Sequence, residues 1–183
     1  MEITSVLGIS TDVLNEEDIA WLLDFEESAD CITTYDLSAE YEDQIRLMVY
    51  VDYDGEPRTN IPLSIYNCLN LANDCKCEAI YFAPNHPFVT YLADTHDIEH
   101  LKRKHESPVI LKMATLSLDL SEEHVNLLNH EADNFSDNGV YPKYEYGWYI
   151  DCNDTTKNSM SEIFNEIKDD ISDIDIICID SDA

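Results

Sequence analysis

The pattern of apolar and polar positions predicts short strands and amphipathic helices that alternate along the chain. In the first half, runs rich in β-branched and aromatic residues predict strands at 5–9, 31–35, 45–53 and 79–82. Apolar positions at helical spacing predict one helix after Asn15, which is a suitable N-cap residue, and another over 63–72, behind Pro62. The predicted order of elements in this half is therefore β-α-β-β-α-β, and the strand at 45–53 is expected to be buried on both faces.

The second half is predicted to repeat this order. Strands are expected at 113–118, in an aromatic hairpin over 141–152, and at 175–179. Helices are expected after the N-cap candidate Ser121 and over 159–171, where apolar and acidic residues alternate at helical spacing.

Short matches between the halves suggest an internal duplication. The segment LNEEDIAWLL at 14–23 corresponds to LSEEHVNLLN at 120–129. Three further matches follow in the same order, and they pair 50–52 with 149–151, 65–67 with 163–165, and 78–82 with 175–179. We therefore predict an α+β protein of two similar β-α-β-β-α-β lobes, at 1–84 and 113–183, joined by a linker at 85–112.

Composition narrows the class of protein. With 183 residues, 44% of them hydrophobic, the chain can bury a core. It has no apolar run near the roughly 20 residues of a membrane span and no basic leader at its N-terminus. We therefore expect a cytoplasmic protein whose six cysteines are buried thiols. Cys75 and Cys77 stand too close for a zinc knuckle, so no metal or other cofactor is expected.

Charge is the strongest signal in the composition. The chain holds 39 acidic residues against 10 lysines and arginines, a net charge of −29 that is spread over both halves. Self-repulsion at this level destabilises a compact state, so we expect function to use the charge. The linker carries the basic and histidine cluster, whose role is open between countering the acidic lobes and forming a pH-sensitive or backbone-binding patch. Its members are His96, His100, Lys102, Arg103, Lys104 and His105.

No enzyme motif accounts for the chain. The phosphate-binding, zinc-protease and nucleophile-elbow patterns are absent, and only four glycines are present. The enzyme alternative is a metal-dependent nuclease, built from Asp52, Asp151 and Asp180 if they meet in space. Such an enzyme would also need a basic surface to hold its substrate. We therefore predict a binding protein and not an enzyme.

Helices can arrange the carboxylates into rows. Side chains three or four positions apart on a helix lie about 5–6 Å from one another, and duplex DNA carries one charge per about 1.7 Å of its axis. The acidic residues selected by this geometry as a partner-binding surface are Glu16, Glu17, Asp24, Glu26, Glu27, Glu40, Glu42, Asp43, Glu122, Glu123, Glu162, Glu166, Asp169 and Asp170. Tyrosines that either join this surface or pack within strands are Tyr35, Tyr41, Tyr144 and Tyr146.

In size, charge and lack of catalytic motifs, the chain resembles the small acidic inhibitors that mobile elements carry against bacterial defence. These are antirestriction DNA mimics and acidic anti-CRISPR proteins, and the closest resemblance in length and character is to type II-A Cas9 inhibitors. The doubled element order is also similar to an uncharacterised domain family of plasmids and phages.

This resemblance implies a DNA-binding defence protein, Cas9 or a restriction enzyme, as the partner in the host cytoplasm. For Cas9 it implies the cleft that reads the PAM duplex with arginines, without direct binding of the inhibitor to nucleic acid. The open alternatives are an acidic adaptor for another basic protein, a charge that serves solubility, and association as a homodimer.

Overall fold

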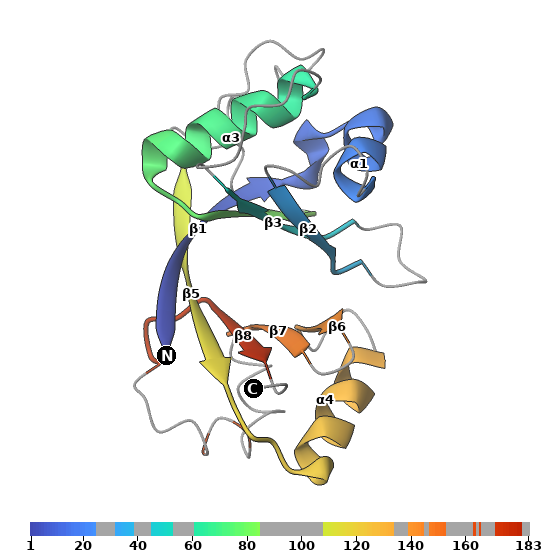
Figure 1. The fold of residues 1–183 in the computed structure, drawn as a ribbon, viewed down its shortest axis with the longest axis vertical. Coiled ribbons are helices and arrows are strands. Elements are labelled where there is room, and N and C mark those ends of the chain that lie inside the picture. The colour runs from blue at the N-terminus through green and yellow to red at the C-terminus, as the bar shows by residue number, and fades with distance from the viewer. Residues whose placement is uncertain are drawn as a thin grey trace. The chain divides into compact units, whose positions relative to one another are not determined.

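The computed structural model describes residues 1–24, 32–38, 45–52, 61–84, 108–133, 139–144, 147–152, 163, 165 and 171–180. Within these ranges the chain has a mixed α/β fold and divides into two compact units (Figure 1). The N-terminal unit contains the described residues between Ser5 and Ile110. The C-terminal unit contains those from Leu111 onward, together with Met1–Thr4. The mixed class agrees with the prediction.

A four-stranded sheet forms the centre of the N-terminal unit. Its elements are β1 (Glu2–Ser10), the 3₁₀ turn η1 (Thr11–Val13), α1 (Glu16–Leu23), β2 (Ile32–Asp36), β3 (Leu47–Val51), α3 (Leu63–Cys75) and β4 (Ala79–Ala83). The strand order is β2-β3-β4-β1, in which β1 and β4 are parallel and the other two pairs are antiparallel. Helices α1 and α3 lie on the same face of this sheet (Figure 1).

Alternate strand positions fill the space under these helices. Leu7, Val49 and Phe82 are buried in one cluster with Leu22 of α1 and Ile65 of α3. Burying such a side chain contributes about 1.5–3 kcal/mol relative to leaving it exposed.

The prediction that the strand at 45–53 is buried on both faces is confirmed at 47–49 alone, because Ile45 and Arg46 before them are partly exposed. Leu47, Met48 and Val49 are buried, while Tyr50 and Val51 are partly exposed.

The C-terminal unit has a second four-stranded arrangement. Its elements are β5 (Val109–Ser117), α4 (Glu122–Asp133), β6 (Val140–Tyr144), β7 (Gly147–Asp151) and β8 (Ile176–Asp180). Strand β5 is parallel to β8, while β8 with β7 and β7 with β6 are antiparallel. Between β7 and β8, Ile163 and Asn165 are helical, and Ile163 is fully buried with Leu128 and Trp148.

Several predicted boundaries differ from the structure. Strand β1 begins at Glu2 and not at Ser5, and helix α3 continues beyond residue 72 to Cys75. Strand β5 begins at Val109, inside the segment predicted as a linker, and not at Met113. The helix predicted over 159–171 does not include Ile171, although this side chain still packs against the core of its unit. The aromatic hairpin predicted over 141–152 is confirmed as β6 and β7.

Both units use the same pattern of backbone hydrogen bonds. Glu78 N donates to Ser5 O at 3.0 Å, and Asp175 N donates to Lys112 O at 2.9 Å. Next to these bonds, Val51 N donates to Glu78 O at 2.9 Å, and Cys152 N donates to Asp175 O at 2.8 Å. Val51 therefore corresponds to Cys152, whereas the sequence match of 50–52 with 149–151 pairs it with Ile150. A shift of two residues keeps each side chain on the same face of the sheet.

Candidate acidic interaction surface

The first turn of α1 presents two exposed carboxylates. Asn15 is the N-cap, and its side chain accepts a hydrogen bond from Asp18 N at 2.9 Å. The Asp18 carboxylate in turn accepts from Asn15 N at 3.0 Å and is buried, at 3% exposure. Glu16 and Glu17 are left exposed beside the positive end of the helix dipole, which stabilises their negative charge.

The predicted acidic row does not continue along this helix. Helix α1 ends at Leu23, and Asp24 is its C-cap with extended backbone, φ −84° and ψ 99°. Asp24 is exposed, but its carboxylate no longer follows the helical spacing from Glu16 and Glu17. The prediction of one helical row from Glu16 through Asp24 is therefore wrong for this residue.

Helix α4 presents the corresponding pair. Ser121 Oγ accepts a hydrogen bond from His124 N at 3.3 Å, which confirms the predicted N-cap. Glu122 and Glu123 follow in the first turn, and both are exposed. His124 occupies the position that Asp18 holds in α1, so the carboxylate that closes the cap of α1 has no counterpart here.

Two acidic residues join these pairs although helix geometry did not select them. Asp12 lies in η1, four residues before Glu16, and Asp119 lies three residues before Glu122. Both are exposed. Each unit therefore has three exposed carboxylates within six residues of sequence at the start of a helix, and we call these groups the acidic triads: Asp12, Glu16 and Glu17, and Asp119, Glu122 and Glu123. A search for acids before N-caps would have found the third member of each.

The other predicted contact residues lie outside the described part of the chain. They are Glu26, Glu27, Glu40, Glu42, Asp43, Glu162, Glu166, Asp169 and Asp170. The same holds for the basic and histidine cluster and for Tyr41 and Tyr146. Tyr35 is partly exposed on β2 and meets the ring of Tyr50 edge-on, with ring centroids 5.9 Å apart. Tyr144 is the last residue of β6.

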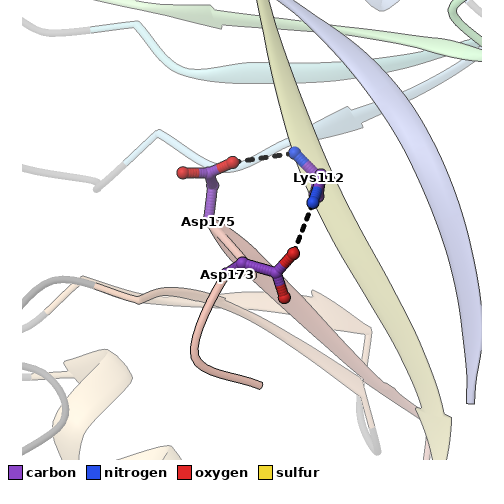
Figure 2. Close-up of polar contacts among 3 residues, drawn as sticks. All are labelled: Lys112, Asp173 and Asp175. Carbon is purple, nitrogen blue, oxygen red and sulfur yellow. Dashed lines mark hydrogen bonds and ion pairs between the residues drawn. The ribbon is translucent and has the colours of Figure 1, made fainter. Parts of the chain in front are cut away.

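One exposed lysine is held by carboxylates of its own unit. Lys112 forms an ion pair with Asp173, and its backbone N–H donates to Asp175 Oδ2 at 2.8 Å (Figure 2). The hydrogen bond to Asp173, with the charges of Asp173 and Asp175, raises the pKa of Lys112. The positive charge of Lys112 is thus balanced by the neighbouring carboxylates of Asp173 and Asp175.

The carboxylates of the nuclease alternative are not assembled within the C-terminal unit. Asp151 pairs with Ile176 in the β7–β8 ladder, while Asp180 pairs with Gly147 at the other end. Four residues of strand separate the two aspartates, which is about 13 Å. Asp151 also accepts a hydrogen bond from Tyr141 Oη at 3.3 Å. Two carboxylates so far apart cannot bind the same metal ion.

The acidic triads are chemically suited to binding cations. Carboxylates fixed on a folded backbone pair with guanidinium groups through two parallel hydrogen bonds.

No protein-family model, curated protein or solved structure matches the chain. No helix in the described ranges is long and apolar enough to cross a membrane.

Proposed function

We propose that this protein is an acidic inhibitor that occupies the nucleic-acid-binding cleft of a bacterial defence nuclease. In its specific form, the proposal is that the protein is an anti-CRISPR, which binds Cas9 at the cleft for the PAM duplex. The observation that carries the proposal is the pair of acidic triads, in a chain whose net charge is −29. The protein acts by binding in the cytoplasm of the host bacterium and catalyses no reaction.

The physical basis is competition with DNA for the same arginines and lysines. A cleft built for DNA gains affinity when phosphates replace its counterions, and carboxylates held in place can replace phosphates in that role. Long-range attraction between a −29 chain and a basic cleft also speeds their encounter. Because Asn15 and Ser121 fix the start of each helix, Glu16, Glu17, Glu122 and Glu123 start from ordered backbone.

The shared architecture of the units supports a duplicated origin for this surface. The same parallel pairing of first and last strands, the same antiparallel neighbours and the same N-cap position occur in both. We infer that an ancestral β-α-β-β-α-β lobe with an acidic helix start was duplicated. Selection for cation binding would then retain Glu16 and Glu17 in one copy and Glu122 and Glu123 in the other.

The test measures binding of labelled PAM duplex to a Cas9–guide complex by fluorescence anisotropy as the protein is titrated in. We expect displacement of the duplex, and an apparent affinity that falls steeply between 50 mM and 500 mM salt. Glu16→Gln with Glu17→Gln, and Glu122→Gln with Glu123→Gln, should each weaken inhibition about tenfold, which corresponds to about 1.4 kcal/mol. The control is Glu2→Gln with Glu78→Gln, which removes the same charge from two exposed positions outside the acidic triads, one in β1 and one directly before β4.

Other experimental outcomes would assign a different function to the protein. If DNA binding by a restriction enzyme is blocked and that by Cas9 is not, the protein is an antirestriction DNA mimic. Capture of a basic partner that binds no nucleic acid would identify an adaptor. Tight binding that persists at about 1 M salt would indicate an apolar interface. Mg²⁺-dependent cleavage of DNA or RNA that is lost in Asp52→Ala or Asp151→Ala would establish an enzyme.

A further inference from the structure

Two cysteines stand at the C-terminal end of α3, in a turn that backbone hydrogen bonds define. Cys75 is the last residue of the helix, Lys76 is its C-cap, and Cys77 follows. Cys77 N donates to Ala72 O at 2.9 Å, and Lys76 N donates to Asn73 O at 3.0 Å. These two bonds form a Schellman motif, in which a residue in the left-handed conformation ends the helix. The backbone between the two cysteines is therefore held in one conformation.

This conformation fixes how far apart the two cysteines are. The distance between the Cα atoms on either side of a residue depends on the φ and ψ of that residue. Lys76 has φ 58° and ψ 38°, which is close to the mirror image of α-helical backbone. A mirror image keeps this distance, so the Cα atoms of Cys75 and Cys77 are about 5.4 Å apart, as in a helix. Disulfides usually join Cα atoms that are between about 4.4 and 6.8 Å apart.

The two side chains border the same core. Cys77 is fully buried in the hydrophobic cluster of the N-terminal unit, together with Ala72. Its Sγ–H donates to Cys75 O at 3.9 Å, so the sulfur lies beside the backbone of Cys75. The Cys75 side chain packs against the same cluster and is partly exposed. Both residues are free thiols.

Exposure and charge determine what can react with this pair. A small molecule in solvent can reach Cys75, whereas Cys77 can react only with a group that is already attached beside it. The neighbouring side chains of Asp74, Lys76 and Glu78 are all exposed, and two of these three are acidic. In a chain with a net charge of −29, such a site attracts a cationic reagent and repels an anionic one.

We propose that Cys75 and Cys77 form a redox-active dithiol, which a small disulfide oxidant converts into an intrachain disulfide across the Lys76 turn. Cys75 Sγ loses its proton and attacks one sulfur of the oxidant, which forms a mixed disulfide and releases one thiolate. Cys77 Sγ then loses its proton, attacks Cys75 Sγ and displaces the second thiolate. The two released thiolates take up two protons. Two cysteine thiols are thus oxidised, and one disulfide is reduced to two thiols.

A reversible pair of this kind suits the cytoplasm, where we expect this protein. Cytosolic thiols are kept reduced, and the disulfides that form there are usually transient and serve catalysis or redox sensing. The ring closed by Cys75 and Cys77 spans only three residues, so the bond restricts the unfolded chain little and adds little stability. This inference is independent of the proposed function, because no member of the acidic triads takes part.

The test treats the reduced full-length chain with cystamine, a cationic disulfide, and then blocks the remaining thiols with iodoacetamide. Chymotrypsin cleavage after Leu71 and Tyr81 places Cys75 and Cys77 in one peptide without Cys68. Mass spectrometry should find this peptide two hydrogens lighter than its reduced form, with neither cystamine adduct nor iodoacetamide label. Dithiothreitol should restore both thiols. Cys68, which is fully buried, should stay reduced throughout.

Matched variants separate the two steps. In Cys77→Ala the mixed disulfide on Cys75 has no thiol beside it, so the cystamine adduct should accumulate at least tenfold above its level in the unaltered chain. In Cys75→Ala the first step is lost, so Cys77 should react at least tenfold more slowly. Cys68→Ala removes a buried thiol of the same core outside the turn, and it should leave disulfide formation unchanged. The peptide masses of the unaltered chain are decisive even if a variant does not fold.

The proposal is overturned if the cystamine adduct on Cys75 accumulates in the unaltered chain as it does in Cys77→Ala. It is also overturned if Cys75 forms its disulfide with another cysteine, or if neither Cys75 nor Cys77 reacts. Displacement of DNA from Cas9 is measured separately on the reduced protein, so either proposal can fail alone.

Discussion

Asn15 and Asp18 each satisfy the other's backbone N–H at the start of α1. Asn15 Oδ1 accepts from Asp18 N at 2.9 Å, and Asp18 Oδ2 accepts from Asn15 N at 3.0 Å. At the corresponding position of α4, Ser121 Oγ makes one longer bond to His124 N, at 3.3 Å. The same helix start is therefore secured by two side-chain bonds in one unit and by one in the other.

We predict that Asn15→Ala destabilises the protein by about 1 kcal/mol, with about 2 kcal/mol as the upper limit, and that Ser121→Ala has a smaller effect. Urea unfolding followed by tryptophan fluorescence measures both, because Trp21 lies in the N-terminal core and Trp148 in the C-terminal core. The control is Asn70→Ala, an exposed position within α3, which should leave stability unchanged or slightly higher. An equal or larger loss for Ser121→Ala would contradict the ranking.

The contact between Asn129 and Trp148 supports a second prediction. Trp148 is fully buried, and its Nε1–H donates to Asn129 Oδ1 at 3.2 Å. Removing the acceptor leaves a buried donor unpaired, so Asn129→Ala should cost about 1–3 kcal/mol of unfolding free energy. Asn126→Ala, an exposed asparagine of the same helix, is the matched control and should cost little. If the two variants unfold alike, the hydrogen bond contributes nothing measurable.

Local signals explain why most elements were predictable from sequence. A helix start depends on residues within one turn, so Asn15 and Ser121 were identified as N-caps from their own neighbours. Strand β4 also follows directly from its apolar run, closed by Pro84. The start of β5 at Val109 was not predicted, because the charged Lys112 was assigned to the linker. In the structure Ile110 is exposed, so this end of the strand lacks a buried apolar face.

The predicted acidic row was less reliable than the helix starts, because it also depended on where helix α1 ends. The row through Asp24 assumed a longer helix, and no cap residue in the sequence marks Leu23 as its end. The register of β5 with β8 could not be predicted from local sequence either, since the contact of Lys112 with Asp175 joins residues 63 apart in sequence. Such contacts depend on tertiary packing, which neighbouring residues do not encode.

The bond between Lys112 and Asp173 gives a third prediction, on pH. The pKa of Lys112 is raised above its ordinary value of 10.5, first by the hydrogen bond to Asp173 and then by its charge, with a smaller contribution from Asp175. Asp173→Asn should therefore lower the pKa of Lys112 toward 10.5 more than Asp175→Asn does. NMR titration of the lysine side chain measures both shifts.

The sign of the stability effect follows from the raised pKa. Because the folded state binds this proton more tightly, the pair stabilises the fold below pH 10.5, and this contribution is lost as pH rises through the raised pKa. Its size should be small, since both side chains are at least half exposed. A larger pKa shift in Asp175→Asn than in Asp173→Asn would contradict the assignment.

The thiols around the end of α3 give the last prediction. Burial raises the pKa of Cys68, and the charge of Asp18 adds to the effect. Burial, followed by the charge of Cys75, raises the pKa of Cys77 from 9.0 to about 11. Cys75 is partly exposed, and its pKa is also raised. Since the thiolate is the reactive form, iodoacetamide at pH 8 should label Cys75 before Cys68 and Cys77, as peptide mass spectrometry would record.

The same shift predicts how stability depends on pH in the alkaline range. Between pH 9 and 11, Cys77 ionises in the unfolded chain while it stays neutral in the folded one. The unfolded state is therefore stabilised relative to the folded state. The stabilising contribution is complete below pH 9 and lost as pH rises through about 11. Tyrosines and lysines titrate in the same range, so the measured quantity is the difference in unfolding free energy between the unaltered chain and Cys77→Ala. That difference should shrink with rising pH, and a constant difference would show that the thiol does not titrate as its burial requires.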